Sequence, residues 1–491
     1  MVREEAERHP EASIEVFASD EHRLGLKPFS RRCWAPRGQR PLALGHHRFE
    51  WLYVTAFVSP SSGETFWYLS NGVVHCGRTI LEGVSVLDAA SMYEVRDEDL
   101  VSDRHWRYPY DQEGTLTNEI EAGEGLVELI RAAVDRCSPS DRPVWLSLSG
   151  GYDSVAIAGA MAELPDRDVR CLSYIHGIPP ENSDAAVAST VASRLGFPHR
   201  LLESYGGDLL THIQRNAYMG IGMANACDEV DAWVQLGESE ADPTPPVMLV
   251  GDHFLPANPD RLAKEVPRPP PGKLWGPEVV NWLTVRLNPT LSEAFYEGMP
   301  QDLARVSAEI DNVGDRIRGF LFFEQRLPNV LLSWRHMFPG RYFQVRNPLL
   351  DNDVLDFTAS VASEVRGGTY YHQAVARAFP HLFGEPRAQI QGYYVRLSHE
   401  IARNARAIRR QIQKADSPLD WLIPPPVGMW MLGRVAGGRR LSRRVAVRLG
   451  LRKRHRSTPT GDAASVSRRF GEPMVLRRYL ILREALKKAV L

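Results

Sequence analysis

Residues 144–162 read VWLSLSGGYDSVAIAGAMA, and this stretch decides the fold class. Its first six residues are apolar on both faces, which is typical of a buried strand in a parallel sheet. From Ser154 onward, small and apolar residues recur with helical spacing. A glycine turn, Ser-Gly-Gly-Tyr-Asp-Ser, therefore joins the carboxyl end of a strand to the start of a helix.

This turn has the residue types of an anion site. Backbone N–H groups and the helix dipole at a helix N-terminus favour a negative ligand, usually a phosphate. Gly150 and Gly151 permit close backbone approach, and the Ser149 and Ser154 hydroxyls can donate to phosphate oxygens. Asp153 would repel a phosphate unless a cation lay between them, which indicates Mg²⁺. The alternative is a glycine turn that only joins strand to helix; the loop lacks GxxxxGK[ST], so it is not a Walker-type loop.

Strand and helix patterns alternate on both sides of the turn. Alternation at this spacing predicts an α/β fold: a doubly wound, mostly parallel sheet with helices on both faces, followed by a helical C-terminal part. We expect strands at 169–177 and 247–252, helices at 125–137, 154–164 and 183–196, and mainly helices from about 280 to 415.

Composition excludes several classes of protein. The chain has 491 residues, 43% hydrophobic and 24% charged, with a formal net charge of -1, so it has no global attraction for nucleic acid or acidic membranes. Its five cysteines show no CxxC spacing, which indicates free thiols in a reducing compartment. The first 16 residues have no apolar core of a signal peptide, and no run is long enough for a membrane span. We expect a cytoplasmic protein with neither a membrane span nor a nucleic-acid partner.

The motif SGGYDS resembles the pyrophosphate loop SGGxDS of the N-type ATP pyrophosphatases. The surrounding sequence resembles the synthetase domain of the asparagine synthetase family, which includes β-lactam synthetases and lasso-peptide cyclases. The resemblance runs from about residue 70 to 390. It includes NGVVHCGRTILEGVSVLDAASMYEV at 71–95, VRCLSYIHG and the following helix at 169–204, and FQVRNPLLDNDVLDFTASVASEVR at 343–366.

The resemblance implies an adenine nucleotide alpha hydrolase-like fold and an ATP-dependent, amide-forming ligase. In this family ATP adenylates a carboxylate, aspartate by default, and an amine attacks after pyrophosphate has left with Mg²⁺. The implied catalytic residues are Asp153 and Asp252, with Asp153 as the metal ligand. The implied ATP and pyrophosphate ligands are Leu148, Ser149, Gly150, Gly151, Asp153, Ser154, Tyr174, Val250 and Gly251.

Two positions depart from the family pattern. Leu255 stands where a second metal-binding aspartate is expected, with Asp260 as a substitute on a longer, proline-rich loop at 255–276. Gly368 stands where the family has a lysine that stabilises negative charge. Arg366, His372 or Arg377 could supply positive charge instead. A nucleotide-binding pseudoenzyme, or a relative that cyclises a peptide or a β-lactam precursor, therefore remains an alternative.

The N-terminal region differs from a glutamine-hydrolysing synthetase. Val2 follows Met1 where such an enzyme needs a cysteine nucleophile, so the expected amine is ammonia or an internal amine of a small-molecule or peptide substrate. Residues 16–69 resemble the start of a DDE transposase domain of bacterial insertion sequences, with Asp20 as its first metal-binding aspartate. We expect strands at 14–18, 49–59 and 64–70, the last two as a hairpin. A DNA-acting transposase derivative is the third hypothesis.

These patterns divide the chain into four parts. We expect a truncated, RNase H-like β fragment at 1–69, an amidotransferase remnant and linker at 70–120, the ATP-binding ligase domain at 121–395, and a basic helical tail at 396–491. Within the tail, 434–456 is arginine-rich and could bind an acidic peptide, nucleic acid or membrane, although a solvated basic face is the simpler interpretation. The last segment, from residue 472, has the pattern of an amphipathic basic helix.

Overall fold

The structure is a computed structural model. It describes residues 18–25, 51–58, scattered positions between 68 and 108, 114–239, 244–252, 327–366 except 329, 369–383, 388–436 and 473–488. The predictions for Leu255, Asp260, Gly368, the loop at 255–276 and the arginine-rich stretch beyond residue 436 lie outside these residues.

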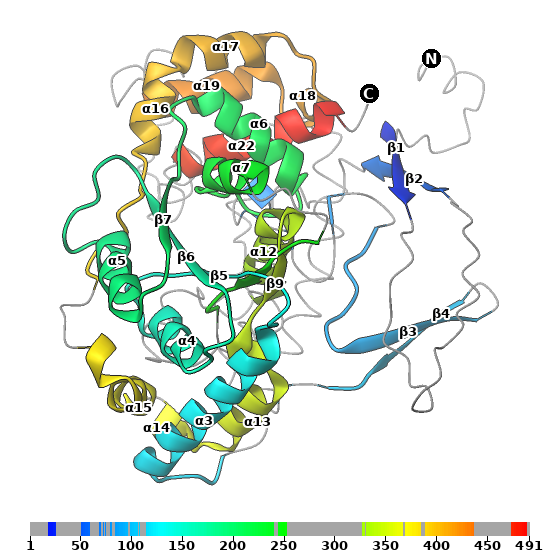
Figure 1. Cartoon of the computed structure of the whole chain (residues 1–491). Helices are drawn as coiled ribbons and strands as arrows, with labels where there is room; N and C mark the ends of the chain where they lie inside the picture. Colours follow the sequence, from blue (N-terminus) through cyan, green and yellow to red (C-terminus); the bar gives the residue numbers. More distant parts are fainter. Residues whose placement is uncertain are drawn as a thin grey trace, which may run out of the picture.

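The centre of the fold is a parallel sheet of five strands (Figure 1). The strand order is β7-β6-β5-β8-β9, so the chain builds outward from β5 to one edge and then to the other. The expected α/β fold with a doubly wound, mostly parallel sheet is confirmed. The strands are β5 (Val144–Ser147), β6 (Val169–Ile175), β7 (His199–Glu203), β8 (Val247–Leu249) and β9 (Gln344–Arg346).

Helices cover both faces of the sheet because successive strand residues point in opposite directions. Val144 and Leu146 of β5 enter one core, and Trp145 between them enters another. The first core includes residues from α3 (Glu119–Cys137), α4 (Tyr152–Ala162), α5 (Asp184–Leu195), α13 (Asn352–Ser360) and α15 (Tyr370–Ala378). The second includes residues from α6 (Leu209–Gly220) and α7 (Val230–Ser239), with Trp334 and Met337 of α12 (Ser333–Met337) packed against it.

Local capping sets the ends of these helices. The Asn118 side chain accepts from the backbone N–H groups of Ile120 and Glu121, so α3 begins before the predicted start at residue 125. Gly196 ends α5 with φ of +69°, the left-handed conformation that glycine adopts without strain. The predicted helices and strands flanking the SGGYDS turn are all present.

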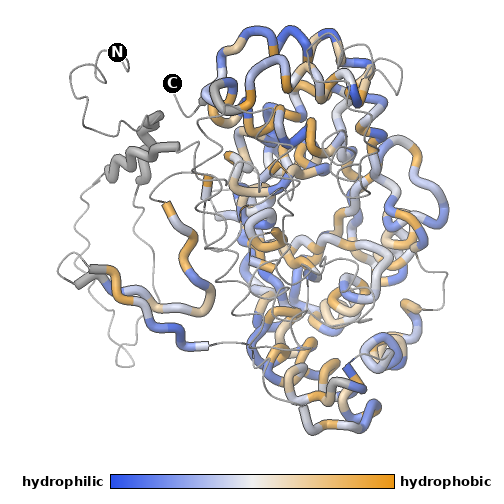
Figure 2. Tube along the Cα trace, turned by 180° about the vertical axis from the view of Figure 1, so that it is seen from behind, coloured by the Kyte–Doolittle hydropathy of each residue, from blue (hydrophilic) through white to orange (hydrophobic). Residues whose placement is uncertain are grey.

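A third core joins the C-terminal helices to α6. It includes residues of α16 (Leu397–Arg403), α17 (Ala405–Gln413), α18 (Leu419–Leu422), α19 (Pro425–Ala436) and α22 (Pro473–Lys488). The hydropathy-coloured trace in Figure 2 shows orange hydrophobic stretches running through this helical part and the sheet region alike.

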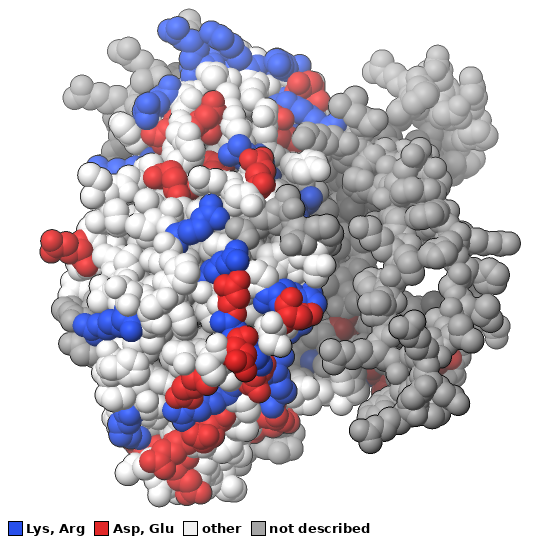
Figure 3. Space-filling view, viewed as in Figure 1, with Lys and Arg blue, Asp and Glu red and all other residues white. Residues whose placement is uncertain are grey.

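The predicted C-terminal helix is present as α22, and it is buried from Val475 to Arg483, including its arginines Arg477 and Arg478. Its apolar residues pack on α6, α16 and α19, while aspartates elsewhere in the fold neutralise Arg477 and Arg483. The exposed basic side chains gather instead at the top of Figure 3, where Figure 1 shows α17; elsewhere on this face acidic and basic groups mix.

The N-terminal strands form a two-stranded sheet among the described residues, which omit 59–67. β2 (Trp51–Val58) confirms the expected strand at 49–59, and its antiparallel partner in this part of the chain is β1 (Ala18–Gly25). Tyr68 and Leu69, expected in the second strand of the hairpin, have helical backbone and are buried in the third core, where apolar packing overrides strand propensity. Asp20 lies inside β1 rather than after a strand. A second hairpin, β3 (Ser91–Arg96) with β4 (Asp99–Arg104), follows.

Candidate functional site

The candidate site lies where the strand order reverses. β5 and β8 are neighbours in the sheet, and the chain leaves their carboxyl ends in opposite directions, which is the usual place of a ligand crevice in an open α/β sheet. A cavity of about 230 Å³ opens there. It is lined by Ser147, Leu148, Ser149, Asp153, Ser154, Ser173, Tyr174, Asp184, Ala185, Glu229, Gly251, Asp252, Trp334, Arg335, Gln391 and Tyr393.

The SGGYDS loop is held by its own serines. The Ser149 backbone N–H donates to the Ser154 hydroxyl oxygen at 3.0 Å, and the Ser154 hydroxyl lies 2.9 Å from both the carbonyl and the hydroxyl of Ser149. Gly151 is the N-cap of α4 and makes no side-chain cap hydrogen bond. Without a side-chain cap, the first turn of α4 leaves N–H groups that could bind an anion.

The two glycines serve different purposes. A Cβ on Gly150 would lie 2.6 Å from the Cβ of Ala388 and 2.8 Å from that of Val187, so packing against α5 already requires glycine there. Gly150 lines a separate hollow of about 300 Å³ rather than the cavity. A Cβ on Gly151 would meet only the Ser149 hydroxyl at 3.3 Å, so its outer side is open to a ligand.

Asp153 lies in the cavity at the first turn of α4. The Tyr371 hydroxyl of α15 donates to its Oδ1 at 3.1 Å. A Cβ on Gly251 would lie 3.3 Å from the Asp153 Cβ, so the end of β8 approaches the loop closely because residue 251 is glycine. Among the described residues no three His, Cys, Asp or Glu side chains form a metal-binding group. Mg²⁺ commonly binds one or two carboxylates plus substrate phosphates and waters, and Asp153 fits that arrangement.

Asp252 is held by a buried arginine. Arg335 of α12 donates from Nε to Oδ2 at 2.7 Å and from Nη2 to Oδ1 at 3.1 Å, and the side chains are only 15% and 14% exposed. The Asn347 side-chain amide donates to the backbone carbonyl of Asp252 at 2.5 Å. Although burial alone would lower it, Asp252 keeps the pKa of Arg335 above its ordinary value. The Asp252 carboxylate therefore faces a permanent cation.

The residues expected around adenosine line the same end of the sheet. Leu148 and Tyr174 border the cavity, and the buried Ser173 hydroxyl donates to the Leu148 carbonyl at 2.7 Å. The Tyr174 ring lies edge-on between Trp233 and Tyr393, with centroids 5.6 and 5.7 Å away. The Val250 side chain is fully buried in the second core, so only its backbone can face a ligand.

Sequence reasoning did not single out Glu229, which also lines the cavity. It is 7% exposed, and burial, with the neighbouring Asp228 carboxylate, raises its pKa. Among the described residues it forms no ion pair within 4 Å. The signal in the sequence was the acidic run Asp228-Glu229-Val230-Asp231, but three nearby carboxylates do not reveal which one faces a ligand.

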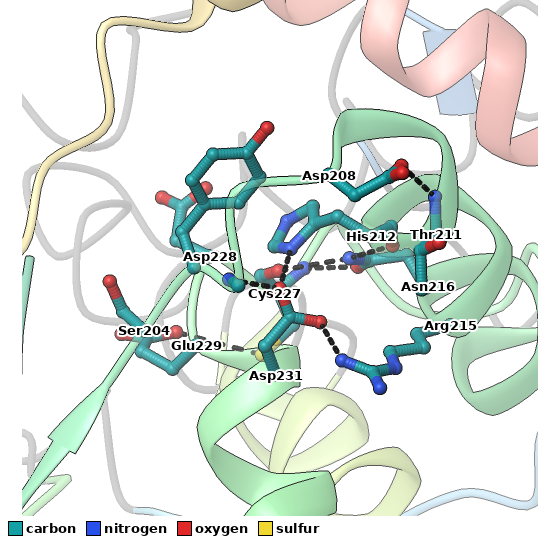
Figure 4. Close-up of polar contacts among 12 residues, drawn as sticks. Ser204, Asp208, Thr211, His212, Arg215, Asn216, Cys227, Asp228, Glu229 and Asp231 are labelled. Atoms are coloured by element: carbon teal, nitrogen blue, oxygen red, sulfur yellow. Dashed lines mark hydrogen bonds and ion pairs between the residues drawn. The ribbon is translucent and has the colours of Figure 1, made fainter.

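A polar cluster behind Glu229 fixes the segment that carries it (Figure 4). Asp231 accepts from Arg215 at 2.7 Å, from the Gly206 backbone N–H at 2.8 Å, and lies 3.1 Å from His212 Nδ1. The Cys227 backbone N–H donates to Asn216 at 2.6 Å. Arg477 of α22 forms an ion pair with Asp228. The segment 227–231 is thereby anchored to α6 and α22.

The positively charged residues considered in place of the family lysine lie elsewhere. Arg366 donates to the Tyr108 hydroxyl at 3.2 Å, His372 stacks on Tyr152 with centroids 4.0 Å apart, and Arg377 is exposed on α15. None of them lines the cavity. Arg335 does, although nothing in its sequence context distinguished it from other arginines.

Part of this chain is similar to known proteins. Residues 125–229 match the family model described as asparagine synthase. A stretch of 76 residues, 15% of this chain, is 42% identical to 22% of the tRNA(Ile)-lysidine synthase of Methylobacterium sp. (strain 4-46). A stretch of 88 residues, 18% of this chain, is 39% identical to 12% of asparagine synthetase (glutamine-hydrolyzing) 2 of Bacillus subtilis (strain 168). The matches span less than a quarter of either relative's length.

The family match covers the elements that build the cavity's loop side, from α3 through β5, the SGGYDS turn and α4 to Glu229. Within the described part of the chain, no helix has the length and hydrophobicity to cross a membrane. Residues 125–229 of this chain are therefore similar to the asparagine synthase family.

Proposed function

We propose that this protein is an ATP-dependent, amide-forming ligase that adenylates a carboxylate. The observation that carries the proposal is the SGGYDS loop at the sheet's switch point, with Asp153 facing a cavity that Asp252 and Glu229 also line. The asparagine synthase family match and the resemblance to two synthases support an ATP-dependent ligase. Aspartate, or a peptide carboxylate in a cyclising relative, is the substrate we propose.

The first chemical step forms a bond between a carboxylate oxygen and the α-phosphorus of ATP. The bond from that phosphorus to the bridging oxygen breaks, and pyrophosphate leaves with the electron pair. The N–H groups at the start of α4 and the hydroxyls of Ser149 and Ser154 would hold the pyrophosphate. Mg²⁺, when bound at Asp153, would neutralise charge on the phosphates.

In the second step an amine attacks the acyl carbon, the bond to AMP breaks, and the nitrogen must lose a proton. Glu229 suits this last event because burial raises its pKa, and general bases work best when their pKa approaches the working pH. Leu148, Tyr174 and the Val250–Gly251 backbone would border the adenosine.

The test measures ATP binding and pyrophosphate release separately, with Mg²⁺ and a panel of carboxylates that includes aspartate. We expect both in the wild type, and we expect Asp153→Asn to lower pyrophosphate release by about 10²–10³-fold, as loss of one transition-state stabilising group does. Asp166→Asn, at an exposed position beyond α4, is the matched control and should retain the full rate. ATP binding without pyrophosphate release would identify a pseudoenzyme, and absence of both would refute the proposal.

A further inference from the structure

Arg335 is a largely buried cation at the cavity, with its side chain 15% exposed. It lies in the short helix α12, and its guanidinium lies over the Trp334 ring, 4.4 Å from the ring centroid. Both residues line the cavity together with residues of the SGGYDS loop, which lies much earlier in the sequence. Stacking and the two bonds to Asp252 restrict the planar guanidinium to one orientation.

Arg335 is a cation among several acidic side chains that line the cavity. The acidic side chains that line it are Asp153, Asp184, Glu229 and Asp252, and Arg335 is the single Lys or Arg among the described lining residues. A nucleotide triphosphate is itself strongly anionic. Repulsion from the carboxylates must be offset by cations, and a desolvated guanidinium acts strongly because the local dielectric is low.

The geometry leaves part of the guanidinium for a ligand. Asp252 uses Nε and one hydrogen of Nη2, and Nη1 has no hydrogen-bond partner among the described residues. The Asn347 amide donates to the backbone carbonyl of Asp252 and so fixes the main chain that carries this carboxylate. One side of the Arg335 guanidinium is thus held by Asp252, and the other side is available to a ligand in the cavity.

We infer that Arg335 binds phosphate oxygens of the nucleotide and stabilises the pyrophosphate as it leaves, with Asp252 as its positioning residue. This inference rests on the proposed function. As the bond to the α-phosphorus breaks, the electron pair stays on the pyrophosphate oxygen, and the N–H groups of Arg335 donate to that growing charge. No further reactant is needed.

The decisive experiment measures binding of Mg²⁺–pyrophosphate by calorimetry to wild type, Asp252→Asn and the double variant Asp252→Asn/Arg335→Met. Asp252→Asn removes the negative charge that competes with phosphate for Arg335 but keeps an amide oxygen that can accept from and position the guanidinium, so affinity should be equal or higher. The double variant, which leaves no unpaired buried charge, should bind about 10- to 100-fold more weakly, as expected for loss of a charge-assisted hydrogen bond. Equal affinity of the two variants would overturn the inference, because a purely structural ion pair predicts no difference between them.

A rate measurement distinguishes the contribution of the planar guanidinium of Arg335 from that of its positive charge. Arg335→Lys keeps the charge and loses the planar fork, so it should retain more of the pyrophosphate release rate than Arg335→Met, which should lose about 10²–10³-fold in kcat. Arg377→Met, an exposed arginine on α15, is the matched control and should keep the wild-type rate. A wild-type protein that binds ATP and releases pyrophosphate while Arg335→Met does so equally would refute only this inference. A wild type that does neither would refute the proposed function first.

Discussion

Two arginines with largely buried side chains make the same kind of pair in two regions of the molecule. Arg335 beside the sheet and Arg483 in α22 each hold an aspartate through Nε and Nη2, with N–O distances of 2.7 and 3.1 Å to Asp252 and of 2.9 and 2.8 Å to Asp420. Arg335 lines the cavity, whereas Arg483 is 1% exposed within the third core and also binds Asp416.

The difference teaches what determines the role of a buried pair. Desolvation of both ions offsets much of their attraction, so a buried pair adds little net stability, but removing one partner leaves an uncompensated charge. In the third core protein groups surround the ion pair, so removing one partner affects the stability of the fold. At the cavity one side of the guanidinium is open to a ligand, so we expect removal of the pair to affect function as well.

The largest expected effect is on stability and concerns Arg483→Met. The substitution leaves Asp420, itself buried, without its cation and should reduce the free energy of unfolding by about 3–5 kcal/mol. Chemical denaturation measures this, with the exposed Arg409→Met on α17 as the control expected to change little. A loss in Arg483→Met no greater than in the control would show that the pair is not what holds α22 in the core.

Asp231 provides the intermediate case, a buried acid anchored next to the cavity. Burial alone would raise its pKa, but His212, the Gly206 N–H and Arg215 together lower it from 3.8 to about 2. The native state therefore binds fewer protons than the unfolded state in this range. The resulting stability, about 2 kcal/mol, is fully present above pH 4 and is lost as pH falls towards 2.

Denaturation of wild type and Asp231→Asn between pH 2 and 6 tests this contribution. The variant should be less stable near neutrality and should lose less stability on acidification than the wild type. Parallel acid curves for the two proteins would contradict the assignment of this pH dependence to Asp231.

The smallest expected change in stability is at Glu229. Its pKa is raised by burial, so the charged form is disfavoured in the native state and stability falls as pH rises above the ordinary value of 4.5. Glu229→Gln should therefore unfold at equal or higher denaturant concentration at pH 7, while amide formation decreases and its pH profile flattens. A destabilised Glu229→Gln with unchanged kinetics would place this residue with Arg483 as a structural group.

Several features could be read from residues close together in the chain. The strand–turn–helix at SGGYDS, the alternation around it and the end of α5 at Gly196 depend on hydrophobic periodicity, turn chemistry and capping, which act over a few residues. The asparagine synthase resemblance followed from the same local pattern, and it holds for the segment that the family model matches.

Other features required the tertiary structure, because their partners are distant in sequence. The Asp252–Arg335 pair joins residues 83 positions apart, and the Asp153–Tyr371 bond joins residues 218 positions apart. The burial of the arginines of α22 depends on aspartates outside this helix, so the sequence pattern of the helix alone could not reveal it. By itself, the sequence determined the loop, its strand and its helix, whose geometry is local. Only the folded chain decided which charges face the cavity, because desolvation and pairing depend on three-dimensional neighbours.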